Sequence, residues 1–225
     1  MIDTINPQGR VIAAAVRLAA ERPWGDVALL DIAESAGISL AEMRAHFASK
    51  GEIVAAFART IDDEVLAKAS MRPTGQSARD TLFEVIMNRF DALTPHRKAM
   101  KSIYQSRSAD PAFIRSFLSS QSWMLNAAGV STDGIEGGLK VAGVASVYVS
   151  VFTTWLDDDD PGLARTMAAL DRRLRRGERT MASIEEVTSA MKRMASIFST
   201  SPRTSDNGPS ASAPGKVNEA ERPAT

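Results

Sequence analysis

Apolar residues recur every three or four positions along most of this chain, the spacing of amphipathic helices. No stretch alternates apolar and polar residues for long enough to suggest a β-strand. The pattern therefore predicts an all-α fold. Start and stop signals place helices over residues 8–22, 28–36, 40–47, 50–68, 77–93, 96–105, 111–128, 133–156, 161–180 and 184–199.

Several of these helices have recognisable first turns. Three begin with a cap residue directly before proline, namely Asn6-Pro7, Asp110-Pro111 and Asp160-Pro161. Ser49 and Glu52 have the spacing of a capping box. Because proline suits the first helical position and cannot stand further inside, these signals fix the predicted helix starts.

Turn-forming residues and changes in composition predict four segments. Pro73 and Gly75 separate a small N-terminal domain, residues 1–70, from a larger helical domain, residues 71–182. An amphipathic C-terminal helix within residues 183–200 follows. The tail over residues 201–225 is rich in Ser, Pro, Ala and Gly, a composition that predicts disorder.

Residues 27–47 have the pattern of a helix-turn-helix, with two short apolar-faced helices around Gly37 and small Ala33 where they approach. The string DIAESAGISLAEMRAHFASKGEIVAAF resembles the signature of the TetR family of regulators. The likeness spans about residues 8–60. It implies an N-terminal three-helix DNA-binding domain, a larger helical ligand-binding and dimerisation domain, and a homodimer formed by the helices over 133–156 and 161–180.

The resemblance supplies candidate DNA contacts on and around the second short helix. They are Ser39, Ala41, Glu42, Arg44, His46 and Lys50. In the family a small hydroxyl residue and a tyrosine of this helix usually contact DNA phosphates. This chain has Glu42 and Arg44 at those positions. Glu42 opposes phosphate binding, and residues 1–60 hold six basic and seven acidic side chains where a basic face is typical.

Aromatic and methionine residues gather in the second domain, where they can form a core or line a cavity for an apolar ligand. The candidate ligand-binding residues are Phe83, Met87, Phe117, Trp123, Met124, Tyr148 and Phe152. The segment from Val141 to Leu156 contains no charged residue, so we expect a helix buried in a core or at an interface.

A second resemblance covers residues 123–178. The strings WMLNAAGVSTDG and TTWLDDDDPGLARTMAALDRRLRRGER look like the core of the "Coq-nine" family, a lipid-binding accessory of ubiquinone biosynthesis. That resemblance implies the same fold, an isoprenoid or quinone lipid as ligand, and no DNA binding. It also implies a membrane-facing helix, for which the candidates are Ile184, Val187, Met191, Met194 and Phe198.

The residue inventory narrows the function further. The chain has no cysteine, only two histidines and no glycine-rich phosphate loop, so we expect neither an enzyme nor a metal or cofactor site. The N-terminus has no apolar signal segment, which favours a cytoplasmic protein. Two functions remain. The first is a TetR-type regulator that binds operator DNA under the control of an apolar ligand, and the alternative is the lipid-binding accessory with peripheral membrane contact.

Overall fold

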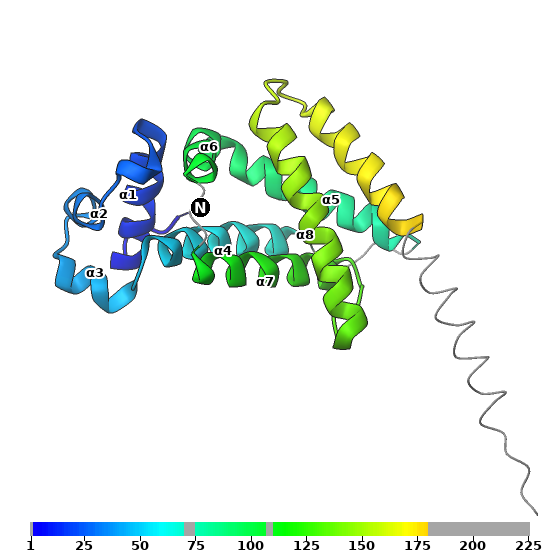
Figure 1. Cartoon of the computed structure of the whole chain (residues 1–225), viewed down its shortest axis with the longest axis horizontal. Coiled ribbons are helices and arrows are strands. Elements are labelled where there is room, and N and C mark those ends of the chain that lie inside the picture. Colours follow the sequence, from blue (N-terminus) through cyan, green and yellow to red (C-terminus); the bar gives the residue numbers. More distant parts are fainter. Residues whose placement is uncertain (1, 70–74, 107–109, 180–225) are drawn as a thin grey trace, which may run out of the picture. The chain divides into compact units, whose positions relative to one another are not determined.

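A computed structural model describes residues 2–69, 75–106 and 110–179 of the chain (Figure 1). Within these ranges the regular structure is helical and contains no strand, as the sequence predicts. The first part comprises α1 (Pro7–Glu21), the 3-10 helix η1 (Trp24–Asp26), α2 (Leu29–Ala36), α3 (Leu40–His46) and α4 (Lys50–Lys68).

The second part continues with further helices. They are α5 (Ala78–Leu93), the 3-10 helix η2 (Thr94–His96), α6 (Arg97–Gln105), α7 (Pro111–Ala127), α8 (Gly134–Leu156) and a helix over residues 164–179. The predicted helix over 184–199, including its five apolar candidates, lies outside the described residues. The bounds of the other predicted helices agree with the structure to within a residue or two, except for the start of the one predicted over 161–180.

The N-terminal capping signals act as the sequence predicts. The side chain of Asn6 accepts a hydrogen bond from the Gly9 N–H at 2.7 Å, and Ser49 Oγ accepts one from the Glu52 N–H at 3.1 Å. Each bond satisfies an N–H group that has no partner inside its helix. Gly37 ends α2 with φ +67°, a left-handed conformation in which glycine has no Cβ clash.

The prediction that Asp160-Pro161 begins a helix is wrong, because residues 161–162 form a turn and the helix begins at 164. Asp158 is completely buried, and its Oδ2 accepts hydrogen bonds from the N–H and the hydroxyl of Thr166, at 2.8 and 2.7 Å. Asp160 Oδ2 accepts the N–H of Ala164 at 2.9 Å. Two carboxylates therefore accept hydrogen bonds from N–H groups in the first turn of this helix. Burial disfavours the charge of Asp158, but the bonds from Thr166 hold its pKa below the usual value.

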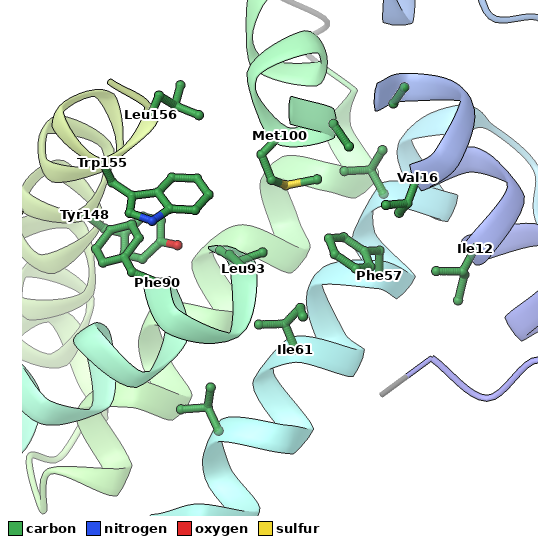
Figure 2. Close-up of a cluster of buried hydrophobic side chains, with 14 of the residues drawn as sticks. Ile12, Val16, Phe57, Ile61, Phe90, Leu93, Met100, Tyr148, Trp155 and Leu156 are labelled. Carbon is green, nitrogen blue, oxygen red and sulfur yellow. The ribbon is translucent and has the colours of Figure 1, made fainter. Parts of the chain in front are cut away.

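One apolar core connects the two parts of the chain (Figure 2). Helix α1 packs on α6, and α4 packs on α7 and α5. Phe57 of α4, Phe90 of α5 and Trp155 of α8 are among the most deeply buried side chains. Helix α4 therefore belongs to the helix-turn-helix part and also packs on the helices of the larger part.

Helix α8 is, within the described ranges, the one helix that is long and apolar enough to cross a membrane by length and composition. About a third of its apolar window, 33%, is buried in the structure. The buried side chains include Tyr148, Val151 and Trp155, which belong to the core, whereas Ile135, Leu139 and Val149 are exposed. This helix therefore contributes one face to the core and leaves another apolar face uncovered.

Candidate DNA interface and ligand pocket

Helix α3 is held by its inner face and exposed along the other. Met43 and Phe47 are buried against the core, and α3 packs on α1 and α2. The hydroxyl of Ser39 caps the helix by accepting a hydrogen bond from the Glu42 N–H at 3.1 Å, so it also stabilises the first turn. The result is a short helix fixed by packing, with an outer surface open to a partner.

The predicted DNA contacts do not all lie on that surface. Ser39, Ala41, Glu42 and Arg44 are exposed, and His46 is partly exposed with Nδ1 3.5 Å from Gln8 Nε2. Glu42 stands on the same short helix as Arg44. The exposed surface of α3 therefore carries one acidic and one basic side chain, without the excess of basic residues that is usual in DNA-binding proteins.

Lys50 is engaged within the protein. Its ammonium donates to the carbonyl oxygens of Trp24 and Val27, at 2.8 and 2.7 Å, and lies 4.7 Å from the centre of the Trp24 ring. Burial lowers the pKa of Lys50, while Asp26 and Asp31 act in the opposite direction. This arrangement ties the first turn of α4 to η1 and the start of α2. We therefore assign Lys50 the role of fixing the helix-turn-helix and leave it out of the proposed DNA contacts.

An apolar cavity of about 650 Å³ lies between helices α4 to α8, a size typical of small-molecule sites. Aromatic side chains dominate its wall. They include Phe57 of α4, Phe113 and Phe117 of α7, Tyr148 and Phe152 of α8, and Tyr104 of α6. Trp24 of η1 also lines the cavity, so the helix-turn-helix part contributes directly to the wall.

A buried ion pair borders this cavity. Arg89 of α5 donates from Nε to Asp62 Oδ1 of α4 at 2.7 Å, with the two side chains 5% and 11% exposed. The guanidinium lies 4.9 Å from the centre of the Tyr148 ring. Burial raises the pKa of Tyr148, although the charge of Arg89 works against this rise. The phenol therefore stays neutral and able to donate a hydrogen bond.

The rim of the cavity joins the first turns of α4 and α7. Ser49 Oγ donates to Asp110 Oδ2 at 2.8 Å, and Asp110 Oδ1 accepts the Ala112 N–H at 2.8 Å. The hydrogen bond from Ser49 holds the pKa of Asp110 below its usual value, with further help from backbone N–H groups. A Cβ atom on Gly51 would lie 2.0 Å from Asp110 Cγ, so this close approach requires glycine.

Three of the seven predicted ligand-binding residues line the cavity, namely Phe117, Tyr148 and Phe152. Met87 and Met124 are buried in the core, Phe83 packs against it, and none of the three lines the cavity. Trp123 also lies away from the wall and is 58% exposed. Phe57 and Arg89 also line the cavity but were not predicted, because they are distant in sequence and meet only in the folded chain.

Comparison with known proteins bears on this arrangement. Residues 11–57 match the model of the family described as bacterial regulatory proteins, tetR family. A crystal structure of a TetR transcriptional regulator from Nitrosomonas europaea ATCC 19718 superposes with a TM-score of 0.59 at 24% identity, over 76% of this chain and 97% of that one. The chain has the TetR fold.

Two further solved structures share the TetR fold. A TetR transcriptional regulator from Rhodococcus sp. RHA1 gives a TM-score of 0.58 at 20% identity, over 75% of this chain and 95% of that one. A tetR-family transcriptional regulator from Streptomyces coelicolor gives a TM-score of 0.54 at 19% identity, over 84% of this chain and 88% of that one. No curated protein matches the chain. At these identities the likeness shows the fold alone.

The comparisons do not support the resemblance of residues 123–178 to the lipid-binding accessory family, and the structure gives its acidic motif a local role. Asp158 and Asp160 satisfy the start of the following helix, as described above. Arg97 donates to the carbonyl of Asp158, and its guanidinium lies 5.0 Å from the centre of the Trp155 ring. The motif therefore fastens the end of α8 and the next helix to α6.

Proposed function

We propose that this protein is a DNA-binding transcriptional regulator whose affinity for its operator is controlled by an apolar ligand. One observation carries the proposal. Helix α3, the second helix of a helix-turn-helix, is fixed by Met43 and Phe47 and leaves its outer face exposed. An exposed helix of this kind is the element that enters the major groove in helix-turn-helix proteins. The match of residues 11–57 to a family of bacterial regulators supports the same function.

The position of the cavity supports ligand control. Its wall includes Trp24 of η1, together with Val54 and Phe57 of α4, all from the part that carries α3. A molecule that fills the cavity would contact these residues directly. Its binding energy can then favour one placement of the helix-turn-helix over another, which is the requirement for coupling two sites.

We further propose a homodimer through α8 and the helix over residues 164–179. Ile135, Leu139 and Val149 of α8 and Met167 of the next helix are exposed apolar side chains. Large exposed apolar surfaces usually mark interaction sites. Light scattering at micromolar concentration should give twice the mass of the 24.2 kDa chain. Ile135→Glu with Leu139→Glu should shift the mass toward that of the monomer, because both side chains are exposed and neither lines the cavity. A monomeric parent chain would contradict this part of the proposal.

The charges of α3 give a test of DNA binding. Arg44→Ala should weaken operator binding by about 1–3 kcal/mol, since Arg44 is an exposed cation on the proposed groove face. Glu42→Gln should strengthen binding, because it removes a negative charge near phosphate without changing the shape of the side chain. Gel-shift titrations against the DNA that flanks the protein's own gene measure both effects at a stated salt concentration.

Arg59→Ala is the matched control for these titrations. Arg59 is also an exposed arginine, but it lies on α4 well beyond the turn that joins α3. Its replacement should leave DNA affinity unchanged. If neither the parent chain nor Glu42→Gln binds DNA at low salt, the proposed function is rejected.

A further inference from the structure

We propose that the cavity selects a neutral, largely apolar molecule that carries a carbonyl-type acceptor, held by the Tyr148 hydroxyl and the Arg89 guanidinium. The inference rests on the proposed function, because it names the chemical class of the ligand for the same cavity. The few polar groups of the wall support it, because such groups determine orientation and specificity in an otherwise apolar site.

Tyr148 is the first of these groups. The residue is 3% exposed and lines the cavity, and the Arg89 guanidinium interacts with its hydroxyl oxygen. Arginine can only donate, so the O–H of Tyr148 itself has no hydrogen-bond acceptor among the described residues. Its ring stacks on Phe90 with 5.0 Å between ring centres, which holds it in place within the core (Figure 2). A buried O–H without an acceptor is costly, so an acceptor supplied by a ligand would remove an existing penalty.

Arg89 supplies further donors at the same place. Its hydrogen bond to Asp62 uses Nε, so the four N–H groups of Nη1 and Nη2 serve the Tyr148 hydroxyl oxygen and any acceptor that a ligand brings. The guanidinium lies over the Tyr148 ring. Donors of two residues therefore lie close together on an apolar wall, as the binding of one ligand oxygen requires.

The charges near the cavity favour a neutral ligand over an anion. Asp62 already balances Arg89, and Asp110 on the rim stays ionised because Ser49 and backbone N–H groups stabilise its charge. A ligand carboxylate would thus bring a third negative charge to a site with one guanidinium. A ketone or ester oxygen accepts the same hydrogen bonds without that repulsion. An ammonium group would instead meet the donors of Tyr148 and Arg89.

Four probes with the same pair of phenyl rings test the choice of head group on the full-length chain. Benzophenone carries a ketone, diphenylmethane a methylene, diphenylacetate a carboxylate and benzhydrylamine an ammonium group. Isothermal titration calorimetry should show benzophenone as the tightest ligand, with the two charged probes at least about tenfold weaker. Tyr148→Phe should weaken benzophenone binding about three- to tenfold, the value of one net hydrogen bond, and leave diphenylmethane unchanged.

Thr153→Val is the matched control, since it also removes one hydroxyl from α8 and Thr153 does not line the cavity. Thr153 is exposed and its hydroxyl donates to the Ser150 carbonyl, so its removal should not change benzophenone binding. A charged probe that binds tightest, failure of benzophenone to bind, or equal effects of the Tyr148 and Thr153 variants would overturn the inference. Gel shifts with the same proteins judge the regulator function separately, because DNA binding without ketone selectivity rejects this inference alone.

Discussion

Replacing Arg89 with leucine should lower the free energy of unfolding by about 3–5 kcal/mol. The substitution leaves the carboxylate of Asp62 buried between α4 and α5 without its cation, at a position where the paired side chains are 11% and 5% exposed. An uncompensated buried charge is far more costly than the loss of one contact. Denaturant unfolding followed by circular dichroism, at one protein concentration, measures the effect.

The double variant Arg89→Leu with Asp62→Leu separates the lost charge balance from lost packing. Buried ion pairs can often be exchanged for apolar residues at little cost, so the double variant should recover most of the stability. Arg175→Ala breaks an exposed pair with Asp171 and should cost about 0.5 kcal/mol or less. Equal losses for Arg175→Ala and Arg89→Leu would show that the Arg89 pair is not buried as described.

Trp24→Ala should also cost about 3–5 kcal/mol, because it empties a buried aromatic position. It further removes the ring beneath the Lys50 ammonium, which fastens α4 to η1. The backbone bond from the Trp24 N–H to Ser102 Oγ, 2.8 Å, does not depend on the side chain and should persist. The variant should therefore stay helical by circular dichroism while its unfolding midpoint falls.

Trp123→Ala is the control for the size of the side chain. Trp123 stands exposed on α7, and its removal should change stability by about 0.5 kcal/mol. If both tryptophan variants lose the same stability, packing at Trp24 does not have the importance that its burial indicates.

The helices of this chain could be predicted from the sequence because their signals are local. Cap residues, proline at the first helical position and Gly37 each act within one turn. The failure at Asp160-Pro161 has a local cause as well. Asp158 accepts a hydrogen bond from Thr166 across a turn. Leu163 in this turn has φ +52°, a left-handed conformation that a leucine rarely adopts and that the sequence pattern does not predict.

The candidate site could be predicted only in part, because a cavity depends on which helix faces meet. Phe117, Tyr148 and Phe152 were expected from their residue type, and they line the wall. Phe57 was missed because it belongs to the helix-turn-helix part. Trp123 was expected but points away, since aromatic content does not indicate which face of α7 turns inward. The sequence also could not show whether Lys50 is available to DNA, because the carbonyl oxygens of Trp24 and Val27 that bind its ammonium come close only in the folded chain.

The close approach of Gly51 and Asp110 has a consequence for how the sequence can change over evolution. Asp110 cannot readily turn aside, because Ser49 and Ala112 bind both of its carboxylate oxygens. Any side chain at position 51 would occupy the space of this carboxylate. Positions 51 and 110 therefore constrain each other across 59 residues of chain, so a homologue with a larger residue at the first should carry a smaller one at the second.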